Sequence, residues 1–496
     1  MDSPNRQTEA ARFYHQVTSH SYTSVRTDGH VLDWDNRPFP FKIYPHAAAL
    51  ALPRELNLSS MPTLEALRDG HAQPHTPLDL DRLTRLLFCT GGLTRKRRVG
   101  MEYYHFRAAA SAGALYPIEI YLAAGPGIEG LEPGLYHFSP ADLKLRGLRR
   151  GDWRGAIARA CGMRPSVEQA PAVLILSAIF WRSAWKYRAR CYRYCFWDSG
   201  TMLANLLAEA RAEELRTGVM LNFVDHEMER LIGVDGEREA PLCVAALGGE
   251  AAPAAGQLEM PPLELETVPL SMQEKSYPDL LAMHRASKLL DAGEVRSIAL
   301  QARASGFSVP KKASGLEVLG LGETIVRRGS TRKFAREQVS AAELTAILDH
   351  SSGQSDVECD FPLLADTYVI VNAVDGIAPG AYFYSRTDRR LELLKAGDFR
   401  GNAGYLCLEQ PLGADCSALL CYMADFNRLL QAMGNRGYRA AQLEAGLCAG
   451  RAYLAAYSLQ RGATGLTFYD DDTVEFFSPH AAGKIPLLMV AVGVPA

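Results

Sequence analysis

The chain has 496 residues, more than a single hydrophobic core usually organises, so we expect at least two domains. Its apolar fraction of 48% and charged fraction of 22% are typical of a globular protein, and a net charge of −3 favours neither a nucleic-acid partner nor an anionic membrane surface. The N-terminus is polar, the apolar runs are too short to span a bilayer, and the ten cysteines form no CxxC pair, so we expect a cytoplasmic protein without membrane segments.

Composition and periodicity divide the chain into four parts. Residues 1–75 are rich in aromatic residues and proline and are predicted to form an extended arm, and residues 251–275 form an Ala-, Pro- and Glu-rich linker. Residues 76–250 and 276–496 are predicted to be two domains, each with buried strands and a long apolar helix. The expected strands are Ile118–Leu122, Val173–Phe180 and Leu242–Leu247, then Thr367–Val371, Ala418–Met423 and Leu487–Val492; the expected helices are Leu83–Phe88, Tyr192–Glu214, Tyr277–Ala302, Leu344–Leu348 and Tyr438–Leu459.

The two halves repeat each other at an almost constant offset. Pro133-Gly134-Leu135-Tyr136 resembles Pro379-Gly380-Ala381-Tyr382, and Tyr192-Arg193 with Gly200 resembles Tyr438-Arg439 with Gly446, both 246 residues apart. Several matches in the same order at one offset indicate a tandem duplication rather than shared common turns. Because helices and strands alternate irregularly, the fold class is predicted to be α+β.

The first half has an unmatched segment before its first strand, running from Arg107 to Pro117. Its Ser111-Ala112-Gly113 turn offers a hydroxyl group and closely approachable backbone amides, which suit the polar edge of a planar cofactor. Arg107 could supply positive charge to a phosphate. The alternative is an ordinary turn that leads into a strand.

The second half has an unmatched basic segment of its own. Arg328, Ser330 and Arg332 alternate, so in an extended segment they would point the same way and could clamp a phosphate. The alternative is a solvated basic loop.

A third difference is the pair Lys186-Tyr187, which is replaced by Ala432-Met433 at the offset of 246. A lysine among aromatic residues can have its pKa lowered by desolvation, which would make it a usable base near neutral pH. The alternative is a surface lysine beside a packing tyrosine.

At these residues the first half resembles the SagB-type dehydrogenase (azoline oxidase) branch of the nitroreductase superfamily, and the second half resembles a more diverged nitroreductase domain. Ser111-Ala112-Gly113-Ala114-Leu115-Tyr116-Pro117 is similar to the Pro-Ser-Ala-Gly-Ala-x-Tyr-Pro signature of that branch, with Ala110 in place of the proline and Asp198 in place of a later glutamate. The resemblance implies two fused nitroreductase-like domains, each with a mixed or antiparallel sheet flanked by helices, that form an intramolecular pseudo-dimer.

The resemblance also implies FMN as cofactor, bound where the two halves meet. Arg107 and Ser111, Ala112 and Gly113 would contribute from the first domain, and Arg328, Ser330, Arg332, Thr464 and Gly465 from the second, with Lys186 or Tyr187 as the base. The opposite site would lack a Ser-Ala-Gly loop, and its expected arm, Thr18-Ser19-His20-Ser21, has no arginine, so one FMN per chain is predicted.

The implied reaction is a two-electron oxidation of an azoline-type heterocycle in a peptide, carrier-bound or small natural-product intermediate, with O2 regenerating the flavin. Two alternatives stay open: an NAD(P)H-dependent reductase of nitro or quinone compounds, and a non-catalytic flavin-binding scaffold in a biosynthetic complex. Further homodimerisation is also open. No metal is expected, because only His71 and His75 have a helical spacing, and they lie in a Pro-containing segment.

Overall fold

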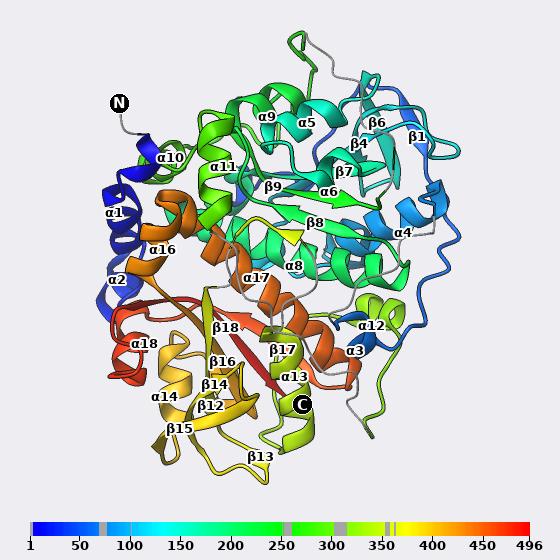
Figure 1. Ribbon diagram of the computed structural model, residues 1–496. Coiled ribbons are helices and arrows are strands. Elements are labelled where there is room, and N and C mark those ends of the chain that lie inside the picture. Colours follow the sequence, from blue (N-terminus) through cyan, green and yellow to red (C-terminus); the bar gives the residue numbers. More distant parts are fainter. Residues whose placement is uncertain are drawn as a thin grey trace.

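A computed structural model describes residues 3–68, 77–100, 102–249, 251, 260–301, 315–352, 358–361 and 364–496. Each half of the chain builds a sheet covered by helices, and the long helices α8 (Cys191–Ala212) and α17 (Asn435–Ser458) cross between the two sheets (Figure 1). The predicted α+β class and the two nitroreductase-like halves are confirmed.

The two large sheets have the same strand order. The first runs β6-β5-β4-β7-β9-β8 and the second runs β15-β14-β12-β16-β18-β17, each antiparallel throughout this core. The first set comprises β4 (Ile118–Ala124), β5 (Gly134–Ser139), β6 (Lys144–Arg150), β7 (Ala172–Ile179), β8 (Thr217–Met220) and β9 (Glu239–Leu247). The second set comprises β12 (Ala365–Val371), β14 (Gly380–Ser385), β15 (Arg390–Ala396), β16 (Ala418–Asp425), β17 (Gly462–Leu466) and β18 (Lys484–Gly493).

Even the irregularities of the sheets repeat. The pairing of β5 with β6 shifts between Leu135 and Tyr136, and that of β14 with β15 shifts between Ala381 and Tyr382. Because a bulge marks one particular backbone position, its recurrence at the offset of 246 supports the duplication.

Helices follow the strands in the same order in both halves. The first half has α4 (Leu80–Gly91), α5 (Arg154–Ala160), α6 (Pro165–Glu168), α7 (Phe180–Tyr187), α8 and α9 (Asp225–Ile232). Their counterparts are α13 (Ala341–Ser352), α14 (Arg400–Leu406), α15 (Pro411–Asp415), α16 (Phe426–Met433), α17 and α18 (Asp470–Phe477), and α12 (Leu321–Arg327) pairs with the short α3 (Thr63–Ala66).

Glycines allow α8 and α17 to approach closely. A Cβ atom added to Gly200 would lie 2.4 Å from the Leu443 carbonyl oxygen, and one added to Gly446 would lie 2.4 Å from the Trp197 carbonyl oxygen. These two glycines are repeat partners, so the crossing lies on the pseudo-two-fold axis that relates the halves. The sequence match at these positions therefore reflects packing.

Reciprocal buried ion pairs join the halves around this crossing. Arg193 on α8 donates to Asp470 at 2.7 Å, and its repeat partner Arg439 on α17 donates to Asp225 at 3.1 Å. Each arginine belongs to one half and each aspartate to the other. Removing either half would leave buried charges without partners, which is costly.

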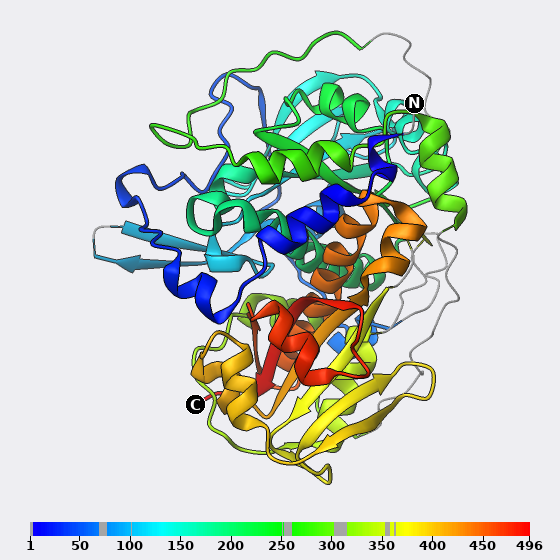
Figure 2. The same cartoon turned by 90° about the vertical axis from the view of Figure 1, so that its left-hand side faces the viewer.

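The N-terminal residues differ from the expected extended arm because they contain regular structure. They form α1 (Glu9–Val17) and α2 (Tyr22–Thr27), and β1 (Ala49–Ala51) adds an edge strand to the first sheet beside β6. Figure 2 shows this segment wrapping along one side of the molecule. Thr18 accepts a hydrogen bond from Arg193, so it braces the interface between the halves.

The expected helix Tyr277–Ala302 is divided into α10 (Pro278–Ala286) and α11 (Ala292–Gln301). Hydrogen bonds to distant segments lie at the break. Ser287 accepts from Arg439 at 2.7 Å, and the Leu289 amide donates to Asp225 at 2.8 Å. Residues 252–259 of the expected linker, and His71 and His75, lie outside the described residues.

Between α4 and the Ser111 turn, where no element was predicted, the chain forms a hairpin of β2 (Leu93–Val99) and β3 (Glu102–Arg107). Smaller strands complete the fold. They are β10 (Val339–Ser340) with β13 (Val374–Asp375), and β11 (Glu358–Cys359), a strand of the second half that pairs in parallel with β8 of the first.

Candidate active site

The Ser111 turn is fixed to helix α8 by one carboxylate. Ser111 Oγ donates to Asp198 Oδ2 at 2.5 Å, and the Ala112 amide donates to Asp198 Oδ1 at 3.0 Å. Ser111 Oγ also accepts from the Tyr116 amide at 2.9 Å. Asp198 is buried, and burial raises its pKa to about 7. The turn is therefore rigidly held beside the helix crossing.

Tyr187 lies directly against this turn. A Cβ atom at Gly113, where φ is 63°, would lie 2.7 Å from Tyr187 Oη, so this position requires glycine on both conformational and steric grounds. The Tyr187 ring packs edge-on against Tyr194, with ring centroids 4.6 Å apart. The structure thus brings Ser111, Ala112, Gly113 and Tyr187 to one place.

Lys186 and Tyr187 also lie near the basic segment of the second half. The Lys186 ammonium is 5.1 Å from the centroid of the Tyr187 ring. Partial loss of hydration and, next, the positive charge of Arg332 lower the pKa of Lys186. Burial is the main reason why the pKa of Tyr187 is raised, while Arg332 opposes that rise. Arg332 is exposed.

Arg328 joins the second half to the first through backbone carbonyl groups. Its Nε donates to the Ala108 oxygen and its Nη2 to the Arg107 oxygen, both at 2.9 Å. Burial lowers the pKa of this guanidinium. Arg328 is buried whereas Arg332 is exposed. The two arginines of the expected phosphate clamp therefore lie in different surroundings, one inside the protein and one at its surface.

Ser330 and Gly465 meet at a residue that the sequence did not single out, Tyr453 on α17. Tyr453 Oη lies 3.2 Å from Ser330 Oγ and accepts from the Gly465 amide at 2.6 Å. The Arg328 guanidinium lies 5.8 Å from the centroid of the same ring. Tyr453 was missed because its spacing in an apolar helix looks like that of any core residue.

Two residues that were expected to bind the cofactor, Arg107 and Thr464, are buried within the protein. The Arg107 guanidinium is buried and donates to the Pro40 oxygen at 2.8 Å and the Ile118 oxygen at 3.2 Å, so the group that it turns toward Arg328 is its carbonyl oxygen. Thr464 is buried in β17, whereas its neighbour Gly465 is exposed.

The counterparts of the candidate site residues, related to them by the repeat, contact other parts of the chain. Gly218, the counterpart of Gly465, is paired with Glu358 of β11. Met433, the counterpart of Tyr187, has its carbonyl oxygen bonded by Asn5 Nδ2 at 2.9 Å. Glu444, the counterpart of Asp198, accepts the Leu364 amide at 2.7 Å.

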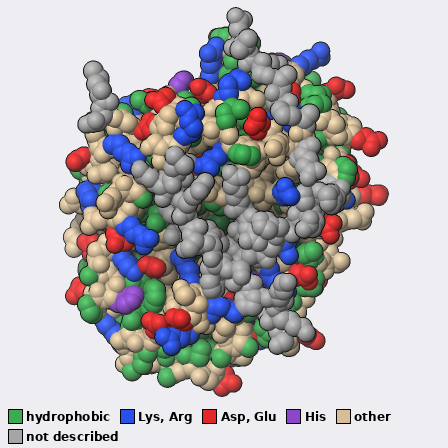
Figure 3. Space-filling view, viewed as in Figure 1, with side chains coloured by type: hydrophobic (Ala, Val, Ile, Leu, Met, Phe, Trp, Pro, Cys, Tyr) green, Lys and Arg blue, Asp and Glu red, His purple; other side chains and the backbone are tan. Residues whose placement is uncertain are grey.

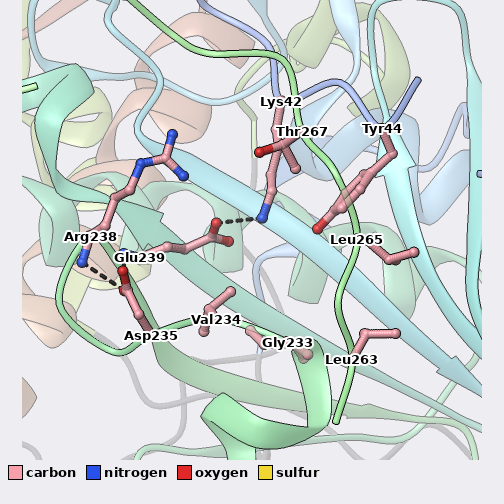
Figure 4. A pocket seen from close by; sticks show the side chains of 11 residues that line it. Lys42, Tyr44, Gly233, Val234, Asp235, Arg238, Glu239, Leu263, Leu265 and Thr267 are labelled. Carbon is pink, nitrogen blue, oxygen red and sulfur yellow. Dashed lines mark hydrogen bonds and ion pairs between the residues drawn. The ribbon is translucent and has the colours of Figure 1, made fainter. Parts of the chain in front are cut away.

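A separate pocket of about 220 Å³ lies at the outer face of the first sheet and contains none of the expected site residues (Figure 4). Lys42 and Glu239 form a buried ion pair of 2.5 Å at its wall. Its remaining lining includes Tyr44, Asp235 and Arg238, with Leu263, Leu265 and Thr267 of the segment between the halves. Among the described residues, no helix combines the length and hydropathy needed to cross a bilayer.

Comparison with known proteins agrees with this architecture. Residues 74–249 match the nitroreductase family. Over its whole length the chain superimposes on a crystal structure from Anabaena variabilis ATCC 29413 that is assigned as a nitroreductase, with a TM-score of 0.77, 26% identity, and coverage of 98% of this chain and 99% of that one.

Three known sequences are similar to about a third of this chain. A protein of Methanocaldococcus jannaschii assigned as a nitroreductase is 28% identical over 173 residues, 35% of this chain and 82% of the relative. The trifolitoxin-processing protein TfxB of Rhizobium leguminosarum bv. trifolii is 31% identical over 173 residues, 34% of this chain and 46% of the relative. The microcin B17-processing protein McbC of Escherichia coli is 27% identical over 146 residues, 29% of this chain and 54% of the relative. The match thus spans about half the length of TfxB and McbC.

These findings define the class of protein. Residues 74–249 are a nitroreductase domain, and the whole-length match extends this architecture to a tandem form. The chain is an oxidoreductase, and the similarity of TfxB and McbC to this chain supports the resemblance to the SagB-type branch that the signature residues predicted. Nitroreductase-family proteins use flavin cofactors.

Proposed function

We propose that this protein is an FMN-dependent oxidase that converts an azoline-type ring of a peptide or related natural-product intermediate into the aromatic azole. The observation that carries the proposal is that Tyr187, with Lys186 over its ring, lies against the Ser111–Gly113 turn. The positive charge of Arg332 from the second half acts on both side chains. The names of TfxB and McbC, which process peptide products, support a peptide substrate.

The residues present suit a flavin mononucleotide. Gly329 leaves its backbone approachable, since an added Cβ would have no neighbour closer than 3.6 Å, and Arg332 is exposed and offers a guanidinium for a phosphate. Ser111, Ala112, Gly113, Ser330, Arg332 and Gly465 would hold the cofactor, while Arg107 and Arg328 brace the walls, and Thr464 packs beneath Gly465. The Gly465 amide already bonds Tyr453 Oη, so a cofactor would share or displace that hydrogen bond.

One FMN per chain is the stoichiometry that we propose. The structure supports it because β11, Asn5 and the Glu444 contacts occupy the counterparts of Gly465, Tyr187 and the Ser111 turn. An ordered backbone strand and buried hydrogen bonds would have to be dismantled before a second cofactor could enter.

The chain's own residues divide the acid–base work. Bound FMN would supply the acceptor for the electron pair and one hydrogen of the ring. Lys186 accepts the other hydrogen as a proton from the acidic ring carbon, because its lowered pKa makes the neutral amine more available. Tyr187, whose pKa is raised, stays protonated and acts as a hydrogen-bond donor that positions the substrate.

The test is oxidation of a synthetic thiazoline-containing peptide by the FMN-loaded protein, followed by the absorbance of the azole. Lys186→Met should lower kcat by at least about a hundredfold, the usual contribution of a general base. Lys144→Met, at the start of strand β6 and away from the site residues, is the matched control and should leave the rate unchanged. With the wild type, kcat/KM should rise with pH along a limb that lies below the ordinary lysine pKa of 10.5.

Three results would count against this proposal. If Lys186→Met oxidises the peptide as fast as the wild type, Lys186 is not the base. If the wild type reduces a nitroaromatic compound with NADPH but leaves the thiazoline peptide unchanged, the protein is a reductase. A protein that takes up no FMN would favour the scaffold alternative.

A further inference from the structure

The hairpin formed by β2 and β3 projects from the body of the molecule (Figure 2). Its two strands form a sheet of their own, and among the described residues neither strand pairs with a third. Backbone groups along the outer edges are therefore open to an added extended chain, which is a common mode of peptide recognition.

The hairpin carries a dense positive charge. Arg95, Lys96, Arg97 and Arg98 are consecutive and exposed on β2, although the whole chain has a net charge of −3. Within the described parts of the chain, no acidic side chain forms an ion pair with Arg95, Lys96 or Arg97. By contrast, charged side chains of both signs are interspersed over the face seen in Figure 3. Arg95, Lys96 and Arg97 thus form a local stretch of positive charge on β2.

One face of the hairpin combines arginines with aromatic rings. Arg95 is opposite Phe106 and Arg97 is opposite Tyr104, so these four side chains share a face. The Arg95 guanidinium lies 4.7 Å from the Phe106 ring centroid, and Arg37 of the N-terminal segment lies 4.9 Å from that of Tyr104. Such stacking limits the freedom of the arginines, which reduces the entropy lost when they bind an anion.

This face leads directly to the proposed cofactor site. Arg95 Nη2 lies 3.8 Å from the position that a Cβ atom would take at Gly329. At the end of β3, the Arg107 carbonyl oxygen accepts the hydrogen bond from Arg328. A peptide lying along the hairpin would therefore have one end beside the Arg328–Gly329 segment of the proposed cofactor site.

We propose that hairpin β2–β3 docks an extended acidic polypeptide segment that accompanies the substrate. Cations at alternate positions of a strand are about 7 Å apart, which matches alternate side chains of an extended peptide rather than one compact phosphate. The identity of the reacting ring rests on the function proposed above, whereas the docking does not. The alternative is that the charges only keep the open strand edges of two molecules from pairing. In that case the hairpin would show no affinity for such a peptide.

The experiment uses the full-length, FMN-loaded protein and a fluorescein-labelled peptide with glutamate at every second position. Fluorescence anisotropy should show binding that weakens as salt is added, and a peptide with glutamine in place of glutamate should not bind. Arg97→Glu should weaken binding by at least about tenfold, because it replaces attraction with repulsion. The control Arg390→Glu, on the exposed strand β15, should bind like the wild type.

Three outcomes would overturn the docking proposal: equal binding of the glutamine peptide, unchanged binding by Arg97→Glu, or equally tight binding of single-stranded DNA of the same charge. With thiazoline peptides, Arg97→Glu should raise KM only when an acidic flank is present. If the wild type oxidises no thiazoline but binds the glutamate peptide as expected, the proposed function fails and the docking surface stands.

Discussion

At the scale of single residues, one carboxylate position has the same role in both halves but different neighbours. Asp198 and Glu444 occupy equivalent positions on α8 and α17, and each accepts backbone amide hydrogens from the segment before the first strand of its sheet. Only Asp198 also binds a serine hydroxyl group. The same carboxylate position therefore anchors the Ser111 turn, where we propose that the cofactor binds, in one half and the segment before β12 in the other.

The raised pKa of Asp198 makes stability depend on pH. Because its pKa rises from 3.8 to about 7 in the folded protein, the folded state holds this proton more tightly than the unfolded state. The resulting stabilisation is complete below about pH 4 and is lost as the pH rises through about 7. From about pH 5 to about pH 8, the unfolding free energy of the wild type should therefore fall relative to that of Asp198→Asn.

Urea unfolding at several pH values measures this difference. Asp471→Asn, an exposed substitution at the start of α18, is the control and should run parallel to the wild type. Parallel curves for Asp198→Asn and the wild type would show that Asp198 does not titrate in this range.

At the scale of elements, the crossing of α8 and α17 depends on the absence of side chains. Gly446→Ala should lower the unfolding free energy by about 3 kcal/mol, because its Cβ would meet backbone atoms, which cannot swing aside as a flexible side chain would. Gly401→Ala in α14 is the matched control, since nothing lies within 4 Å of its added Cβ. That control should be neutral or slightly stabilising, because alanine favours a helix.

Thermal unfolding of the two alanine variants checks this prediction. A shift at Gly446→Ala no larger than that at Gly401→Ala would mean that the helices can separate without cost. The same data bear on the site, since α8 carries Asp198 and α17 carries Tyr453.

At the scale of the whole molecule, the two halves have the same strand order but different residues at equivalent positions. The Ser111 turn and Lys186-Tyr187 exist only in the first half, and the Arg328–Arg332 segment only in the second. Strand β11 of the second half then completes the edge of the first sheet. A duplicated chain can lose one of two sites while the pseudo-symmetric scaffold persists.

We therefore expect one flavin per 54.3 kDa chain. Flavin released by denaturation and measured by absorbance gives the stoichiometry against protein concentration. Arg332→Gln should lower the bound fraction, because it removes the exposed guanidinium that we place at the phosphate. A ratio near two flavins per chain would contradict the single-site architecture.

Much of the scaffold could be predicted from local pattern. The strands Ala172–Ile179 and Ala418–Asp425 and the helices α8 and α17 agree with their predicted ranges to within a few residues, because continuous apolar runs bounded by turn residues are strong signals. The hairpin β2–β3 was missed because the four consecutive basic residues of β2 show no alternation of polar and apolar side chains. A glycine between the basic run and the aromatic residues of β3 was the available signal, and Gly100 has a φ of 62° in the turn.

The sequence by itself determined the duplication, three strands and the long helix of each half, and the residue types that distinguish the halves. Only the tertiary structure decided which of those residues meet. It turned the Arg107 guanidinium toward Pro40, placed Tyr453 between Ser330 and Gly465, and covered Gly218 with β11. The physical reason is that a residue's spacing in the chain fixes its local conformation, whereas its partners depend on how distant segments pack together.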